Sequence, residues 1–149
     1  ITKIKAKTLK ELEEKYLRII PGEMEWNHIY TIFFSPEMAE NKEACMRLLE
    51  EWDSDWQKSP NVFLVVSSSS PDKLYKVKNI PKGAAGQEVS LLIKQSKKQQ
   101  KIKSDQKNDT EKICETPIDY LRHTEQSPEK SVLHQIVIED GKIVLIDKK

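Results

Sequence analysis

The stretch IYTIFFSPEMAENKEACMRLLEEWDSDWQKSPNVFLVV, residues 29–66, decides the fold. It begins and ends with runs, residues 29–34 and 62–66, that are apolar at odd and even positions alike, which is typical of short strands covered on both faces. Between them, Ser35-Pro36 has the form of a helix start, with serine as the N-cap and proline at the first helical position. Apolar side chains then recur at helical spacing until Lys58-Ser59-Pro60. The stretch therefore predicts a strand, a helix and a second strand parallel to the first.

An amphipathic helix is expected before this βαβ core. Thr8 and Glu11 have the spacing of a capping box, in which a hydroxyl and a carboxylate accept hydrogen bonds from backbone N–H groups at the helix start. Pro21-Gly22 ends the apolar pattern that follows.

After the core, the pattern predicts a meander and then a hairpin. Residues 74–80 and 88–94 read as two strands, because Val89, Leu91 and Ile93 alternate with more polar residues. At the C-terminus, Asp140-Gly141 separates two apolar runs, the signature of a hairpin with a type I′ turn.

The segment between these parts is polar and basic. Residues 94–112 hold seven lysines and three carboxylates, and a single aliphatic side chain. We expect a disordered basic insertion at about residues 95–115, within a single interaction domain that spans residues 1–149. The expected fold class is α+β: a mixed sheet with a βαβ core, a meander and a C-terminal β-hairpin, two main helices and one long disordered loop.

Charge is divided along the chain, although the formal net charge is only +1. Residues 37–55 carry seven carboxylates against Lys42 and Arg47, the opposite of the lysine-rich segment. The near-neutral total gives no general attraction to nucleic acid or to an anionic membrane.

Few residues suggest chemistry. His28, His123 and His134 are scattered, and we interpret them as structural; Cys114 is a weak candidate nucleophile. Two cysteines make no disulfide framework and show no zinc spacing, which favours a reduced intracellular compartment. We expect no catalytic residue, no metal, no cofactor and no membrane partner, and the chain has no apolar run long enough to span a bilayer.

The helix of residues 36–58 is the expected partner-binding element. An acidic helix with aromatic side chains near its end can present an anchor surrounded by charges to a protein partner. The candidate partner-binding residues are Glu51, Trp52, Asp53, Asp55 and Trp56. One or both tryptophans could instead lie in the core.

Five prolines follow serine or threonine, a dipeptide that proline-directed kinases recognise. Three of these sites fall in expected loops and are candidate phosphorylation sites: Ser70, Thr116 and Ser127.

These observations favour a non-catalytic protein–protein interaction domain of a larger intracellular, nuclear scaffold or adaptor protein. The alternative is a nucleic-acid-binding module that uses the sheet face and the basic loop residues Lys97, Lys98, Lys101 and Lys103. Against this alternative, no aromatic residue is interleaved with the lysines to stack on bases.

Overall fold

A computed structural model describes residues 3–20, 26–55, 58, 60–81, 84–103, 112–126 and 131–146. The helices are α1 (Leu9–Ile19), a short 3₁₀ helix η1 (Trp26–His28), α2 (Pro36–Glu40), α3 (Lys42–Ser54), α4 (Pro71–Tyr75), α5 (Ala85–Lys103) and α6 (Pro117–Gln126). The strands are β1 (Thr31–Phe34), β2 (Phe63–Ser67), β3 (Lys112–Cys114), β4 (Ser131–Glu139) and β5 (Lys142–Ile146). The α+β class with a mixed sheet is confirmed.

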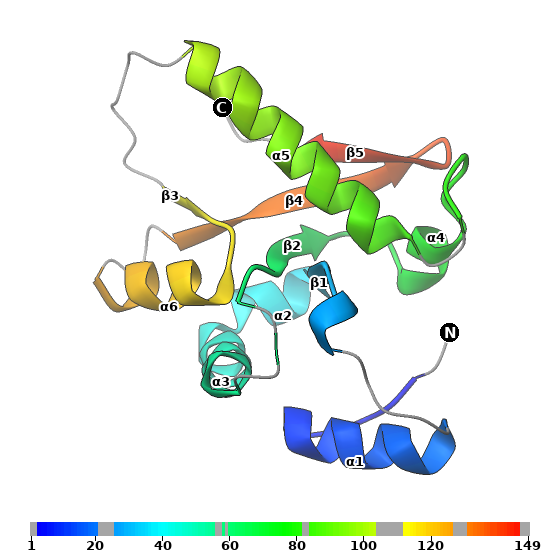
Figure 1. Ribbon diagram of the computed structural model, residues 1–149, viewed down its shortest axis with the longest axis vertical. Coiled ribbons are helices and arrows are strands. Elements are labelled where there is room, and N and C mark those ends of the chain that lie inside the picture. The colour runs from blue at the N-terminus through cyan, green and yellow to red at the C-terminus, as the bar shows by residue number, and fades with distance from the viewer. Residues whose placement is uncertain are drawn as a thin grey trace.

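The sheet is built around β4. Strand β1 pairs with β2 in parallel, β2 and β3 each pair in parallel with β4, and β5 pairs with β4 in the antiparallel sense. The strand order is β1-β2-β4-β3, with β5 joined to β4 (Figure 1). The βαβ core is confirmed, because the two strands at the ends of the quoted stretch are parallel neighbours with Thr31 opposite Phe63.

The C-terminal hairpin is also confirmed. Asp140 and Gly141 have φ angles of 51° and 76°, as a type I′ turn requires at both central positions. Glu139 and Lys142 face each other across the turn.

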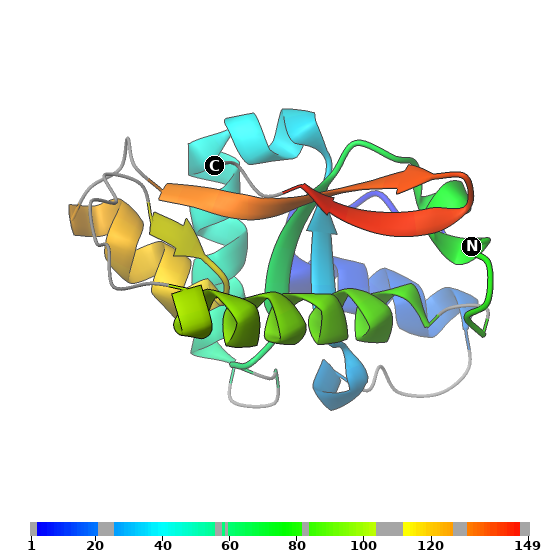
Figure 2. The same cartoon turned by 90° about the horizontal axis from the view of Figure 1, so that it is seen from above.

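Helices cover the sheet on both sides. On one side, α4 and α5 pack on β2 and β4 through Leu74, Val89, Ile93, Val65 and Ile136. On the other side, α3 and α6 pack on β1 and β2. Figure 2 shows α5 and α2 on opposite sides of the β4–β5 hairpin.

The predicted meander is wrong: residues 74–75 end helix α4 and residues 76–80 form turns, whereas residues 88–94 lie within helix α5. Ser70-Pro71 begins α4 with the same backbone conformation as Ser35-Pro36 at the start of α2, with proline at the first helical position, but the Ser70 side chain makes no cap hydrogen bond. In α5, Val89 and Ile93 are buried while Leu91 is 52% exposed, so the burial pattern is helical and not alternating.

The structure describes secondary structure at both ends of the predicted disordered insertion. Residues 95–103 continue α5, in keeping with the high helix propensity of lysine and glutamine, and residues 112–114 form β3. Residues 104–111 lie outside the described residues. The single helix expected after β1 is divided at Asn41, which ends α2 and caps α3 by accepting the Ala44 N–H.

Candidate functional site

The structure places the predicted partner-binding tryptophan in the interior. Trp52 is 2% exposed and packs edge to face against Trp26, with ring centroids 5.4 Å apart and ring planes at 87°. Leu9 and Val62 complete this cluster. Trp52 is therefore a core residue of the junction between α1, η1 and α3, and Trp56 lies outside the described residues.

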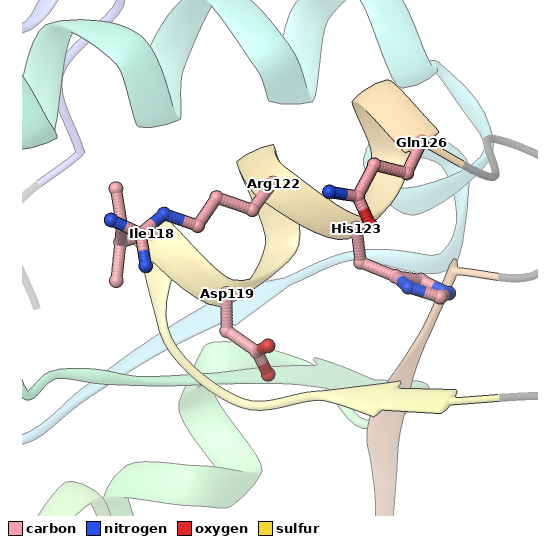
Figure 3. A pocket seen from close by; sticks show the side chains of 5 residues that line it. All are labelled: Ile118, Asp119, Arg122, His123 and Gln126. Atoms are coloured by element: carbon pink, nitrogen blue, oxygen red, sulfur yellow. The ribbon is translucent and has the colours of Figure 1, made fainter.

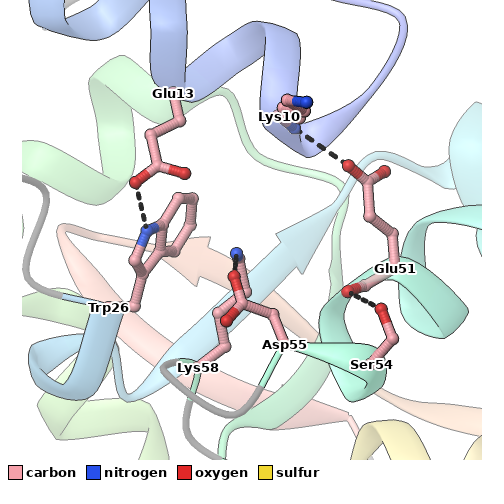
Figure 4. A network of polar contacts seen from close by, with 7 residues as sticks. All are labelled: Lys10, Glu13, Trp26, Glu51, Ser54, Asp55 and Lys58. Carbon is pink, nitrogen blue, oxygen red and sulfur yellow. Dashed lines mark hydrogen bonds and ion pairs between the residues drawn. The ribbon is translucent and has the colours of Figure 1, made fainter.

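Two of the predicted partner-binding carboxylates are engaged within the chain (Figure 4). Glu51 accepts a hydrogen bond from the backbone N–H of Lys10 at 2.9 Å, which attaches the start of α1 to α3. Asp55 forms an ion pair with Lys58. Asp53 is exposed.

Lys58 is a buried cation at this junction. It is 6% exposed, and its ammonium nitrogen lies 4.4 Å from the centroid of the Trp26 ring, within cation–π range. The indole N–H of Trp26 donates to Glu13 of α1 at 3.3 Å. The ion pair and the ring contact join Trp26 to the end of α3, and the hydrogen bond to Glu13 joins Trp26 to α1, which is a structural role.

The outward surface of α2 and α3 is acidic. Its exposed carboxylates are Glu37, Glu40, Glu43, Glu50 and Asp53. The only cationic residues on these two helices are Lys42 and Arg47, so the face carries a net negative charge. Whether the predicted partner-binding residues contact a partner stays a prediction; among those that the structure describes, Asp53 is the one classed as exposed.

The outward surface of α5 is basic. Leu91 and Lys94 are exposed, and by helical spacing positions 98 and 101 continue the face of Lys94. All four predicted basic-loop residues belong to helix α5 and not to a loop: Lys97, Lys98, Lys101 and Lys103. The two charged segments of the sequence are thus on helices that cover opposite sides of the sheet (Figure 2).

A buried polar group joins α5 to the sheet. His134 of β4 places its Nε2 3.0 Å from Glu115, and the other carboxylate oxygen of Glu115 pairs with Lys97. Since a carboxylate only accepts, Nε2 carries the hydrogen that forms this bond. Burial alone raises the pKa of the Glu115 carboxyl, but the hydrogen bonds from His134 and Lys97 outweigh it and hold that pKa below its ordinary value.

This group was not foreseen from the sequence. Histidine and glutamate here are 19 residues apart, and neither has a local motif. The side chains of His134 and Glu115 are 4% and 12% exposed, so the pair has little access to a ligand.

A pocket of about 310 Å³ lies along α6. It is lined by Ile118, Asp119, Arg122, His123 and Gln126, all from this one helix. In Figure 3, the side chains of Arg122 and His123 point in different directions and do not converge on a common point. Among the described residues, no group of three or more His, Cys, Asp or Glu side chains could hold a metal ion.

The cysteines are not placed for nucleophilic chemistry. Cys45 and Cys114 are 1% and 0% exposed, and burial raises the pKa of the Cys45 thiol. Of the candidate phosphorylation sites, Ser70 is exposed at the start of α4, and the hydroxyl of Thr116 accepts the Asp119 N–H at the start of α6. Ser127 lies outside the described residues.

The family model of the spore germination protein N-terminal domain matches residues 1–119. None of the curated proteins and none of the solved structures matches the chain. In the described part of the chain, no helix combines the length and apolar character needed to cross a membrane. The match ends within α6, whereas β4, which pairs with three other strands, lies beyond it.

This match corrects the predicted setting. Spore germination is a bacterial process, so the predictions of a nuclear location and of a nuclear scaffold or adaptor protein are wrong. Regulation by proline-directed phosphorylation was predicted as part of the same function, and the match does not support it. The matched segment covers 119 of the 149 residues, and the chain therefore belongs to the family of spore germination protein N-terminal domains.

Proposed function

We propose that this domain is a non-catalytic, protein-binding part of a bacterial spore germinant receptor, and that it works in a membrane-associated complex. The observation that carries the proposal is the family match over residues 1–119. The structure contributes a candidate surface for the protein partner, the acidic face of α2 and α3.

This acidic face is suited to a protein contact that charge guides. Glu43, Glu50 and Asp53 are exposed on α3, so a partner can reach them without unfolding the domain. The opposite side of the same helix is held in the core by Cys45, Leu49 and Trp52, so the charges stand on a rigid support. Charged groups at the rim of an interface act mainly on the association rate and on the choice of partner.

The test replaces the gene of the full-length protein in a spore-forming host that retains only the receptor containing it. Spores carry either the triple variant Glu43→Lys, Glu50→Lys and Asp53→Lys or the charge-reversal control Lys73→Glu and Lys76→Glu, at the end of α4 and its C-cap. The readout is the fall in optical density of a spore suspension after germinant is added, with immunoblots to show equal protein levels.

We expect the α3 variant to slow germination and the control to leave it unchanged. Equal germination by the α3 variant and the control would remove the acidic face from the proposal. Wild-type germination by spores that lack the full-length protein altogether would overturn the proposed function.

A further inference from the structure

The outer face of α5 combines lysines with an exposed apolar side chain. Gln87, Leu91 and Lys94 are exposed at spacings of four and three residues, and positions 98 and 101 follow at the same helical spacing. The inner face of the helix is fixed by Val89 and Ile93, both 0% exposed. The orientation of α5, and therefore the direction of its lysine face, is set by the core.

Few acids neutralise this face. Within α5, the only carboxylate is Glu88, which is half-buried, against five lysines at positions 94, 97, 98, 101 and 103. Lys97 is at the flank of the helix, where it pairs with Glu115 at the end of β3. Lys94 is exposed on the side of the helix away from Val89 and Ile93, and positions 98 and 101 follow it at helical spacing.

From this arrangement we propose that the outer face of α5 binds the surface of an anionic lipid bilayer. The inference rests on the proposed place of the domain in a membrane-associated complex. Lysines supply attraction to anionic headgroups, and the exposed Leu91 supplies apolar area that can enter the headgroup boundary, a combination typical of interfacial helices. The acidic face of α2 and α3, on the other side of the sheet, then points away from the bilayer and toward a protein partner.

The lipid surface is favoured over nucleic acid by the residue types on this face. It offers an aliphatic side chain beside the lysines, and no aromatic or arginine residue occurs in α5 to stack on bases. Binding to nucleic acid remains a distinct outcome of the experiment.

The experiment is flotation of the 149-residue chain with vesicles. One set contains phosphatidylglycerol and phosphatidylcholine in a ratio of about 1 to 2, the other phosphatidylcholine alone, at about 0.05 M and 0.5 M salt. We expect binding to the anionic vesicles at low salt, weaker binding at high salt and none to the neutral vesicles. Equal binding to both vesicle types, or binding to DNA but to neither vesicle, would overturn the inference.

Two matched pairs of variants locate the binding face. The variant Lys94→Gln, Lys98→Gln and Lys101→Gln removes three charges from α5, and Lys3→Gln, Lys5→Gln and Lys7→Gln removes the same number near α1, at the other end of the molecule in Figure 1. We expect a loss of roughly 100-fold in vesicle partitioning for the α5 variant and a much smaller loss for its control. Likewise Leu91→Gln weakens binding more than Leu17→Gln, whose side chain is exposed on α1.

A spin label reports the orientation without altering the lysines. Because Cys45 and Cys114 are buried, a nitroxide can be attached selectively at Gln87→Cys on α5 or at Glu50→Cys on α3. With anionic vesicles, we expect the label at position 87 to be protected from a water-soluble relaxation agent and the label at position 50 to stay accessible. The reverse pattern, or equal protection, contradicts the inference.

The two proposals fail separately. A domain that does not bind anionic vesicles loses the lipid contact, whereas the germination defect of α3 variants would stand. Spores that germinate normally without the full-length protein would remove the proposed function, and vesicle binding by α5 would then lack a role in germination.

Discussion

The imidazole of His134 donates a hydrogen bond to the carboxylate of Glu115 across 3.0 Å, and Lys97 pairs with the same carboxylate. Three elements, β4, the end of β3 and α5, meet in this contact. Because the contact joins three elements, its removal should lower the free energy of unfolding of the domain.

Replacing Glu115 with glutamine should lower the free energy of unfolding by about 2 kcal/mol, because hydrogen bonds to a charged group are stronger than those to a neutral amide. Lys97→Gln should cost less than about 1 kcal/mol, since the Lys97 side chain is 54% exposed and its ion pair is screened by water. Urea unfolding at neutral pH measures both. Equal losses for the two variants would contradict the assignment of Glu115 as the centre of the contact.

The same carboxylate predicts a dependence of stability on pH. The pKa of Glu115 is lower in the folded chain than its ordinary value of 4.5, so its stabilising contribution is complete above pH 4.5 and is lost as the pH falls through the folded-state pKa. Urea midpoints of the wild type and of Glu115→Gln should therefore converge below pH 4.5. A constant difference between them across this range would show that ionisation of Glu115 does not stabilise the fold.

The two partners of the ion pair at Lys58 should respond unequally to substitution. Lys58→Met should be nearly neutral, because it replaces a buried charge with an apolar side chain and leaves Asp55 partly in water. Asp55→Ala should cost about 3 kcal/mol, since it leaves the 6% exposed Lys58 without its carboxylate. Thermal unfolding followed by circular dichroism compares them, and a larger cost for Lys58→Met would contradict this reading.

The helical assignment of α5 predicts different costs for two neighbouring aliphatic residues. Ile93→Ala should lower the free energy of unfolding by about 3 kcal/mol, and Leu91→Ala by less than about 0.5 kcal/mol. A strand with alternating burial would place both side chains on one face and make the costs similar. Chemical denaturation of the two variants distinguishes the helix from the strand.

The turn of the C-terminal hairpin should be sensitive at Gly141. Its φ of 76° disfavours any residue with a Cβ, and a Cβ there would lie 2.8–2.9 Å from side-chain carbons of Lys78. Gly141→Ala should therefore cost about 1–2 kcal/mol. Asp140→Asn is the control, because asparagine also tolerates a positive φ, and the Tm of the two variants should differ accordingly.

Local signals predicted the parts of the fold that local interactions determine. The βαβ core followed from two apolar runs and the Ser35 cap, and the hairpin followed from Asp140-Gly141, because each pattern excludes most other conformations. The α5 helix was missed because its inner face, Val89 and Ile93, also fits an alternating pattern when Leu91 is counted with it. The Ser70-Pro71 signal for α4 was present in the sequence and has the same form as Ser35-Pro36.

The candidate site was less predictable, because it depends on contacts between distant segments. No local pattern places Glu115 beside His134, or Lys58 over the Trp26 ring. The same is true of Trp52, whose spacing fits an exposed anchor and a core residue equally well until the position of α1 is known. The charge of α3 and α5 could be read directly from the sequence, whereas their positions on opposite sides of the sheet follow from packing between distant segments.

The most direct test of the central claim, that the domain binds a protein of the germinant receptor through its acidic face, is photo-crosslinking in spores. A photoreactive amino acid is placed at Asp53 on α3, or at Gln87 on α5 as the control, in the full-length protein. We expect a crosslink to a receptor protein from position 53 and none to that protein from position 87. A receptor crosslink from position 87 alone, or none from either position, would contradict it.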